Sequence, residues 1–148
     1  MAGSTAYGIS FGIGSTPSII NNIISASGNA QTYGINERDS CKPQAVQNND
    51  FTSFQSPPGG FYRPTTGLLY TTIAGLQDSF SGLPEREIAC SGNTADTPVF
   101  DTAYRLTTGT PLSISKGGMN LAGEGFSTDK DGATRTPPWS IGAYEYDN

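Results

Sequence analysis

Apolar residues along this chain occur in short runs that Gly, Asn and Pro separate. Such runs between turn-forming residues are typical of short β-strands. A helical spacing occurs once, where Ile73, Leu76 and Phe80 would share one face. Thr72, directly before them, is a residue type that caps helices. The pattern therefore predicts an all-β protein with one short helix over residues 72–80.

The first third of the chain contains an internal repeat. The tripeptide Tyr7-Gly-Ile recurs as Tyr33-Gly-Ile, and the pair Asn21-Asn22 recurs as Asn48-Asn49, at offsets of 26 and 27 residues. A fixed period indicates a solenoid, and helical solenoids would need long amphipathic stretches that this chain lacks. At ~3.3 Å per strand residue, a unit of this length can form three short strands and three turns. The repeat therefore predicts a parallel β-helix.

Equivalent residues of neighbouring circuits would stack on one another in such a fold. Asn22 and Asn49 are expected at a tight corner, where Asn tolerates the left-handed backbone conformation. Their side-chain amides would bond from circuit to circuit as an asparagine ladder, and ordinary surface turns are the alternative. The apolar side chains expected to point into the core are those of Ile9, Ile20, Ile23, Ile35 and Val46.

The repeat divides a single domain, residues 1–148, into three regions. Regular circuits are expected over residues 5–55. An irregular, loop-rich insert is expected over residues 56–95, because two adjacent prolines near its start cannot donate to a strand ladder. Circuits return over residues 96–148 and end in a closing segment, so that about four to five circuits are expected in all.

The last region carries a recognisable motif. The pattern D-x-D-G-x-x-R followed by I-G-A-Y-E is carried by Asp129, Asp131, Gly132, Arg135 and Glu145. It resembles the closing segment of right-handed parallel β-helix proteins of the pectate-lyase-like repeat family, in which the last part reads D-I-G-A-Y-E. The resemblance implies a right-handed, single-stranded parallel β-helix and a surface or secreted protein.

The same resemblance extends upstream. Residues 97–100, 104–106 and 110–117 are similar to three successive strands that precede the closing segment in that family. The fold is shared by pectate lyases, polygalacturonases and phage tailspikes. A shared fold does not transfer an activity.

Arg135 is expected to have a structural partner. The family pattern has Asp at the position of Ser140. If that Asp pairs with the Arg in the family, its role here falls to Glu145 or Asp131. The alternative, an Arg that acts as the base of a lyase, would need a carboxylate cluster on the same face.

The acidic turn also contains a weak calcium candidate, Asp129 with Asp131, since alternate carboxylates beside a Gly recur in calcium loops. An EF-hand would need Glu at position 140, where this chain has Ser. A turn in which the carboxylates cap backbone amides is the favoured interpretation. No metal or other cofactor is assigned.

Composition and charge exclude several classes of protein. Seven Phe and seven Tyr argue against a disordered linker of similar polarity. A net charge of −5 with scattered basic residues argues against nucleic-acid binding. No apolar stretch approaches the ~20 residues that a membrane span requires. The first residues lack the features of a signal peptide, so a cytoplasmic location stays open beside the extracellular or cell-surface location that the composition favours.

Cys41 and Cys90 are too few for a disulfide framework, or for a metal site by themselves. A single disulfide between them would suit an extracellular protein. Two separate thiols are the alternative, and the sequence does not decide between the two states.

No catalytic residue is assigned from the sequence. The chain has no His, which excludes the Ser-His and Cys-His nucleophile systems. Asp39, Asp50, Asp96 and Asp101 do not recur in the repeat register. They are therefore interpreted as isolated surface acids rather than as the carboxylate pair of a glycosidase.

Aromatic residues provide a candidate carbohydrate site. Phe61, Tyr62 and Tyr70 are expected in loops, where exposed rings could stack on sugars. Trp139 is a fourth candidate, although its place near the end of the chain also suits a residue that covers the core.

These observations favour a non-enzymatic β-helix module of surface or interaction type that binds carbohydrate or another protein. A polysaccharide lyase or glycoside hydrolase with a reduced set of circuits is the alternative. The first circuit has no visible cap, and uncovered strand edges favour association. A homo-oligomer, or a longer chain of which this is a part, is therefore expected, with no nucleic acid and no membrane span.

Overall fold

The computed structural model describes residues 5–25, 31–39, 41–52, 60–65, 67–81 and 88–146, with the side chains of residues 79–81 excepted. Strands predominate over helices in this part of the chain, as predicted. The strands are β1 (Thr5–Phe11), β2 (Ser18–Ile20), β3 (Ile23–Ser25), β4 (Gln31–Glu37), β5 (Ala45–Gln47), β6 (Asp50–Thr52), β7 (Gly60–Arg63) and β8 (Ala89–Ser91). The helices are α1 (Ile73–Ser81), α2 (Leu112–Ser115) and the 3-10 helix η1 (Ala122–Glu124).

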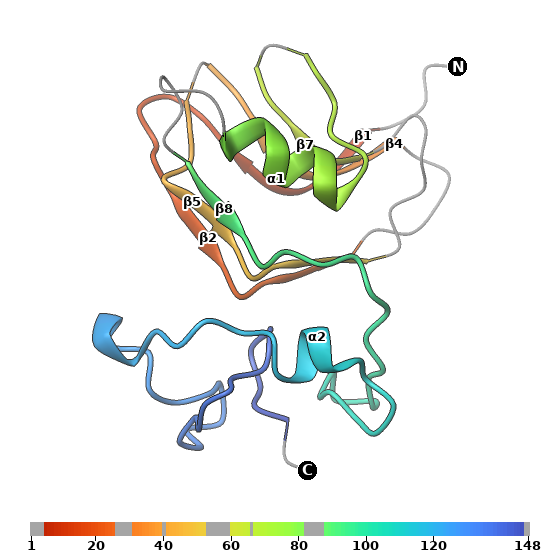
Figure 1. Cartoon of the computed structure of the whole chain (residues 1–148), viewed down its shortest axis with the longest axis vertical. Helices are drawn as coiled ribbons and strands as arrows, with labels where there is room; N and C mark the ends of the chain where they lie inside the picture. Colours follow the sequence, from red (N-terminus) through yellow and green to blue (C-terminus); the bar gives the residue numbers. More distant parts are fainter. Residues whose placement is uncertain are drawn as a thin grey trace.

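The strands form three small parallel sheets, with the orders β1–β4–β7, β2–β5–β8 and β3–β6. The chain passes through the three sheets in the same order twice, and each sheet receives adjacent strands from successive passes (Figure 1). The register matches the sequence repeat, since Ile9 pairs with Ile35 and Ile19 pairs with Val46. The prediction of an all-β protein with parallel pairing is therefore confirmed.

The recurring Tyr-Gly-Ile marks a place where the backbones of β1 and β4 approach the core closely. A Cβ atom added at Gly8 would lie 2.6 Å from Cγ2 of Ile24. One added at Gly34 would lie 2.8 Å from Cδ1 of Phe51. Both obstructing side chains belong to the buried core. Gly recurs at this position because a side chain would displace core residues.

The prediction that five apolar side chains point into the core is correct for three of them. Ile9, Ile35 and Val46 belong to the core or pack against it. The prediction is wrong for Ile20 and Ile23, which are only half-buried and lie outside this cluster. Side chains alternate between the two faces of a strand, so the neighbouring residue of each strand points inward. Those buried neighbours are Ile19 and Ile24.

The corners β2–β3 and β5–β6 are built by the two Asn pairs. The first member of each pair, Asn21 or Asn48, has a positive φ, of 59° and 51°. The prediction that Asn22 and Asn49 adopt the left-handed conformation is therefore wrong by one residue, because the residue before each of them adopts it. On the third pass the equivalent position is Gly92, with a φ of 66°.

The second Asn of each pair forms the asparagine ladder. Oδ1 of Asn49 accepts hydrogen bonds from the backbone N and from Nδ2 of Asn22, both 3.0 Å long. Oδ1 of Asn93 accepts in the same way from the backbone N and Nδ2 of Asn49, at 3.0 and 3.1 Å. Sequence comparison misses Asn93, because it follows Asn49 after 44 residues rather than 27.

The sheets continue within residues 56–95, where the sequence predicts an irregular insert. β7 pairs with β4, β8 pairs with β5, and Thr94 forms a parallel bridge with Asp50. Strands can pair through their main chains when their side chains do not repeat. Loss of the sequence repeat therefore does not mean loss of strand pairing. Of the predicted insert, residues 56–59, 66 and 82–87 lie outside the described residues.

Helix α1 confirms the predicted short helix. Oγ1 of Thr72 accepts a hydrogen bond from the backbone N of Gly75 at 3.0 Å, as an N-cap does. Leu76 is fully buried, and Ile73 packs against the same core. The side chain of Phe80, expected on the same face, lies outside the described set.

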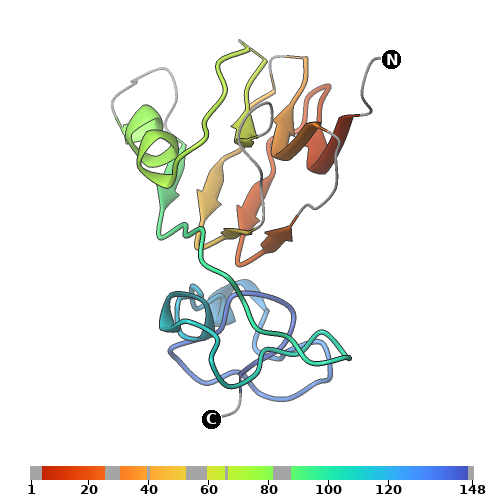
Figure 2. The ribbon, with the colours of Figure 1, turned by 90° about the vertical axis from the view of Figure 1, so that its right-hand side faces the viewer.

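We call residues 95–146 the C-terminal segment. Its named elements are helices instead of strands, and it lies below the parallel sheets in the view of Figure 2. The strands predicted over residues 97–117 are not found in this described stretch. It contains α2, η1 and isolated antiparallel bridges, one of which joins Phe100 to Leu106. The chain reverses between these two residues, where Tyr104 has a φ of 61°. A reversal this tight leaves no room for strands that run parallel to β8.

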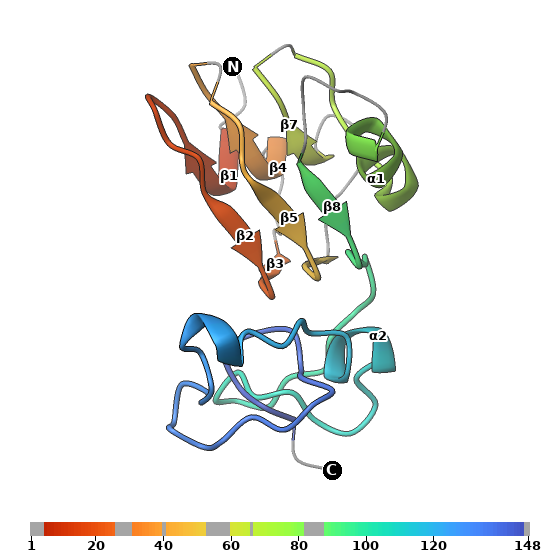
Figure 3. The ribbon, with the colours of Figure 1, turned by 60° about the vertical axis from the view of Figure 1, so that its left-hand side comes forward.

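The C-terminal segment contacts the sheets at the Asn corners (Figure 3). Asn21 donates from Nδ2 to O of Met119 at 2.8 Å and accepts at Oδ1 from N of Met119 at 2.7 Å. The backbone O of Asn21 also accepts from N of Gly142 at 2.9 Å. Nδ2 of Asn48 donates to O of Gly117 at 2.8 Å. We call these hydrogen bonds the corner contact. An apolar cluster beside it consists of Leu106, Ile114 and Ile141, with Ile23 and Tyr146 packed against it.

Candidate binding site

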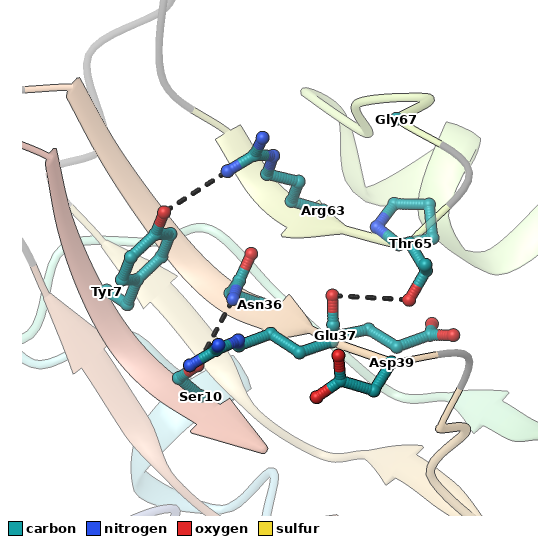
Figure 4. A pocket seen from close by; sticks show the side chains of 10 residues that line it. Tyr7, Ser10, Asn36, Glu37, Asp39, Arg63, Thr65 and Gly67 are labelled. Atoms are coloured by element: carbon teal, nitrogen blue, oxygen red, sulfur yellow. Dashed lines mark hydrogen bonds between the residues drawn. The ribbon is translucent and has the colours of Figure 1, made fainter. Parts of the chain in front are cut away.

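A pocket of about 510 Å³ lies beside the sheet β1–β4–β7 (Figure 4). Equivalent positions line up across parallel strands, and one such row, Ser10, Asn36 and Arg63, contributes to its lining. The chain that follows β4 adds Arg38 and Asp39. The pocket therefore takes its polar groups from three strands that are distant in sequence.

Tyr7 and Arg63 line one side of the pocket, and both pack on the ring of Tyr33 behind them. The rings of Tyr7 and Tyr33 are stacked, with centroids 5.7 Å apart and an angle of 21° between the planes. Cζ of Arg63 lies 5.1 Å from the centroid of the Tyr33 ring. Nη1 of Arg63 donates to the hydroxyl of Tyr7 at 3.1 Å. Tyr7 is 42% exposed, so its ring can be reached by a ligand.

Hydrogen bonds hold the polar side chains around the pocket. Nδ2 of Asn36 donates to Oγ of Ser10 at 3.1 Å. The nearly buried carboxylate of Glu37 accepts at Oε2 from the hydroxyl of Tyr62 at 2.7 Å. Oγ1 of Thr65 donates to the backbone O of Glu37 at 3.4 Å. These contacts fix the lining before any ligand arrives.

The pocket carries both signs of charge. Arg38 and Arg63 supply two guanidinium groups, and Glu37 and Asp39 supply two carboxylates. Among the described residues, neither arginine forms an ion pair with a carboxylate. The arginines can therefore donate to a ligand's hydroxyl or carboxylate oxygens, while Asp39 can accept from its hydroxyls.

The four aromatic residues predicted to bind carbohydrate do not form an exposed surface. Tyr62 and Trp139 are buried, with exposed fractions of 0% and 2%. Phe61 stacks on the core residue Phe51, and Tyr70 packs against the same core. The expected loop is wrong for Phe61 and Tyr62, because both belong to strand β7.

The internal repeat contains a signal for the stacked tyrosines. Tyr7 and Tyr33 precede the repeated Gly-Ile, and their stacking follows from the repeat register. Arg63 carries no such signal, because the pairing of β7 with β4 leaves no repeat in the sequence. Only part of the pocket could therefore be predicted from the sequence.

Arg135 is the centre of the closing segment, as the motif predicts. Nη1 donates to O of Ser140 at 3.2 Å, and Nη2 donates to O of Gly142 at 2.7 Å. Nη1 also lies 3.5 Å from Oε2 of Glu145, in an ion pair whose two side chains are nearly buried. Cζ lies 5.4 Å from the centroid of the Trp139 ring. The partner is therefore Glu145, one of the two candidates.

Glu145 and Ser140 are hydrogen-bonded to each other in the closing segment. Oε1 of Glu145 accepts from N of Ser140 at 3.0 Å. Burial raises the pKa of Glu145, while the Ser140 backbone N–H and the charge of Arg135 oppose this rise. The hydroxyl of Ser140 donates to O of Ser115 at 2.9 Å and so ties the closing segment to α2.

The two carboxylates of the acidic turn bind groups of the protein itself. Oδ1 of Asp129 accepts from the backbone N of Asp131 and of Ala133, both at 2.9 Å. Asp131 forms ion pairs with Arg105 and Lys130. In the described part of the chain, no group of three or more His, Cys, Asp or Glu side chains could hold a metal ion. The geometry is that of a capped turn.

Replacing Arg135 with Ala is expected to lower the free energy of unfolding by about 3 kcal/mol, because the buried Glu145 carboxylate would lose its ion-pair partner. Urea denaturation near neutral pH would measure the change. The control is Arg105→Ala, which removes an ion pair whose arginine side chain is half-exposed, with an expected cost of about 1 kcal/mol or less. Equal losses for the two variants would contradict the structural role of Arg135.

One of the acids interpreted as isolated surface residues is buried. Asp50 is 0% exposed, and its two carboxyl oxygens have no hydrogen-bond partner among the described residues. Burial raises its pKa from 3.8 to about 7, the proximity of the Asp96 backbone N–H opposes this rise, and the nearby charge of Asp96 adds to it. Hydrogen bonds from Ser113 and Thr94 lower the pKa of Asp96. The surface interpretation is therefore wrong for Asp50.

Cys41 and Cys90 are free thiols in different environments, so the disulfide alternative is not the state found. Sγ of Cys41 accepts a hydrogen bond from N of Gly14 at 3.1 Å. Cys90 packs against the core, and burial raises its pKa to about 11, against a smaller opposing effect of the Asn93 hydrogen bond. A thiol with such a pKa is a weak nucleophile at neutral pH.

Comparison of the chain with protein-family models, with curated proteins and with solved structures found no match. No helix in the described ranges is long and apolar enough to cross a bilayer. The functional interpretation therefore rests on the pocket itself.

Proposed function

We propose that this chain is a non-enzymatic binding module that holds a saccharide in the β1–β4–β7 pocket. A sugar ring presents an apolar C–H face, which packs on aromatic rings, and pairs of hydroxyl groups, which planar polar side chains can bond through two atoms at once. Tyr7 supplies the aromatic surface, and Asn36, Asp39 and Arg63 supply planar polar groups.

The position of the Arg63 side chain is the observation that supports the proposal most. Its guanidinium lies over the Tyr33 ring and donates to the Tyr7 hydroxyl, so it connects the stacked tyrosines with the polar row. Stacking and hydrogen bonding reduce the number of conformations that this side chain would lose on binding. A lining that is ordered in advance lowers the entropic cost of holding a ligand.

Replacing Arg63 with Ala is expected to weaken saccharide binding by about tenfold to a hundredfold, since a hydrogen bond from a charged group contributes about 1.5–3 kcal/mol. A glycan array would first identify a bound saccharide, and calorimetry would then give its Kd for each variant. Tyr7→Ala should also weaken binding. Tyr104→Ala is the matched control, because Tyr104 is 78% exposed and does not line the pocket. Equal affinities for Arg63→Ala and Tyr104→Ala would contradict the proposal.

A glycoside hydrolase is the second candidate, because Glu37 and Asp39 both line the pocket. A hydrolase needs two carboxyl groups at about 5–10 Å from each other. The hydrogen bond from Tyr62 and the near-complete burial of Glu37 favour a structural role for that residue. Release of sugar ends by the native protein, abolished in Glu37→Gln, would replace the binding proposal with the enzyme.

We further propose that residues 5–94 are circuits of a short right-handed, single-stranded parallel β-helix. Two features support it: the repeated order of the three sheets and the asparagine ladder that continues through Asn93. Direct measurement of the handedness and closure would come from an experimentally determined structure.

Self-association follows from the edges of the sheets. Among the described strands, β1, β2 and β3 each pair on one side only, so their other edges offer free backbone donors and acceptors. We expect light scattering to give the mass of two or more chains. A monomer at every accessible concentration would contradict association through these edges.

A further inference from the structure

A row of outward side chains lies beside the corner contact. Asp50 begins β6, where it pairs with Ile23 of β3 on one side and with Thr94 on the other. Ile23 packs against the apolar cluster of the C-terminal segment. Asp50 thus occupies the middle of a row whose neighbour is already in contact with that segment. The saccharide pocket uses none of these residues.

Asp50 is fully buried here with both carboxyl oxygens unpartnered among the described residues. The titratable group that faces it is Asp96, at the start of the C-terminal segment. Oδ2 of Asp96 accepts from Oγ1 of Thr94 at 2.9 Å and from Oγ of Ser113 in α2. In the described part of the chain, no Lys or Arg forms an ion pair with either carboxylate.

Two neighbouring carboxyl groups without a cation are unfavourable when both are ionised. Hydrogen bonds to Ser113 and Thr94 stabilise the charge on Asp96, so Asp96 is the member that ionises first. The buried Asp50 then keeps the proton. Loss of that proton would place an unsolvated anion beside a second anion, at the junction of the sheets and the C-terminal segment.

We propose that the proton on Asp50 keeps the C-terminal segment docked on the sheets, and that loss of this proton to solvent releases the corner contact. The carboxyl pair then acts as a pH-sensitive latch. Burial, which raises the pKa of Asp50 to about 7, places the change near neutral pH. Below that pH the latch is closed, and above it hydration of the Asp50 carboxylate favours the open form.

Amide hydrogen exchange on the full chain can test the latch, because individual amides report on separate contacts. The amides of Met119 and Gly142 donate to Asn21 across the corner contact. The amide of Gly118 donates to O of Trp139 within the C-terminal segment, and that of Thr94 donates to O of Asn49 within the sheets. The first pair reports opening, and the second pair is the internal control.

Raising the pH from about 6 to about 8.5 is expected to lower the protection factors of Met119 and Gly142 by about tenfold or more, after correction for intrinsic exchange. Gly118 and Thr94 should keep higher protection. Asp50→Asn, which cannot ionise, should remove the pH dependence at Met119 and Gly142. An unchanged protection of these two amides in the native protein, or an equal loss at all four amides, would overturn the proposal.

Asp96→Asn provides a second variant, in case Asp50→Asn does not fold. Removal of the facing charge should move the midpoint of opening to lower pH, because the neighbouring charge helps to raise the pKa of Asp50. A carboxyl ¹³C titration of Asp50 would read this midpoint directly. An unchanged midpoint in Asp96→Asn would overturn the pairing of the two groups.

Discussion

Replacing Asn49 with Ala is expected to lower the free energy of unfolding by about 5 kcal/mol. Asn49 is fully buried. Its Nδ2 donates to O of Ile19 at 2.8 Å and to Oδ1 of Asn93 at 3.1 Å, and its Oδ1 accepts twice from Asn22. The Ala variant would leave several of these partners buried without a hydrogen bond, at about 1–3 kcal/mol each. Folded domains are stable by about 5–15 kcal/mol in all, so most of the stability would be lost.

Urea denaturation, followed by tyrosine and tryptophan fluorescence, would measure this loss. Gln47→Ala is the matched control, since Gln47 lies two residues away and its side-chain hydrogen bond to Ser91 is exposed. Asn22→Ala should give an intermediate loss, because Asn22 stands at the end of the ladder among the described residues. If Asn49→Ala costs no more than Gln47→Ala, the ladder does not stabilise the fold.

The ladder could be predicted from the sequence because it needs the same residue type at the same place on each pass. Asn22 and Asn49 satisfy this condition with matching neighbours. The roles of Asn21 and Asn48 could not be predicted, because their partners lie 98 and 69 residues away along the chain. A repeat records contacts between circuits, and it carries no record of a segment that packs against them from outside.

The saccharide pocket shows a second limit of the sequence. The prolines before Phe61 and Tyr62 predict a loop and therefore exposed rings. Strand β7 then places these rings in or against the core, and the exposed ring is that of Tyr7. Exposure depends on which face of a strand a residue occupies, and one residue of error in a strand boundary reverses that face.

The closing motif predicted a partner for Arg135 correctly and the surrounding strands wrongly. The ion pair with Glu145 depends on a few residues that are close in sequence. The strands expected over residues 97–117 depend on pairing with a preceding circuit. The reversal at Tyr104 and the helix α2 prevent that pairing. The motif therefore predicted a contact between residues close in sequence correctly, and the pairing of distant strands wrongly.

Asp50→Asn is expected to stabilise the protein at pH 8 and to have little effect near pH 4. The folded state raises the pKa of Asp50 from 3.8 to about 7, so the folded protein binds this proton more tightly than the unfolded chain does. Below pH 3.8 the ionisation of Asp50 therefore does not change the free energy of unfolding. As the pH rises from 3.8 to about 7 it lowers this free energy, and above about pH 7 the loss is constant. At about 1.36 kcal/mol for each pKa unit, the full penalty is about 4 kcal/mol. Asn resembles the neutral acid in shape and avoids that penalty.

Urea denaturation of both proteins between about pH 4 and pH 8.5 would measure the difference in the free energy of unfolding. Glu124→Gln is the control, because Glu124 is an exposed acid of η1 and its loss should not produce a pH-dependent gain. Release of the C-terminal segment would hydrate the Asp50 carboxylate and so limit the penalty to the free energy of docking. A pH-dependent gain in Asp50→Asn, together with pH-dependent exchange at Met119 and Gly142 in the native protein, would link the penalty to the docking of the segment. The absence of any gain at pH 8 would show that Asp50 is ionised without penalty in the folded protein.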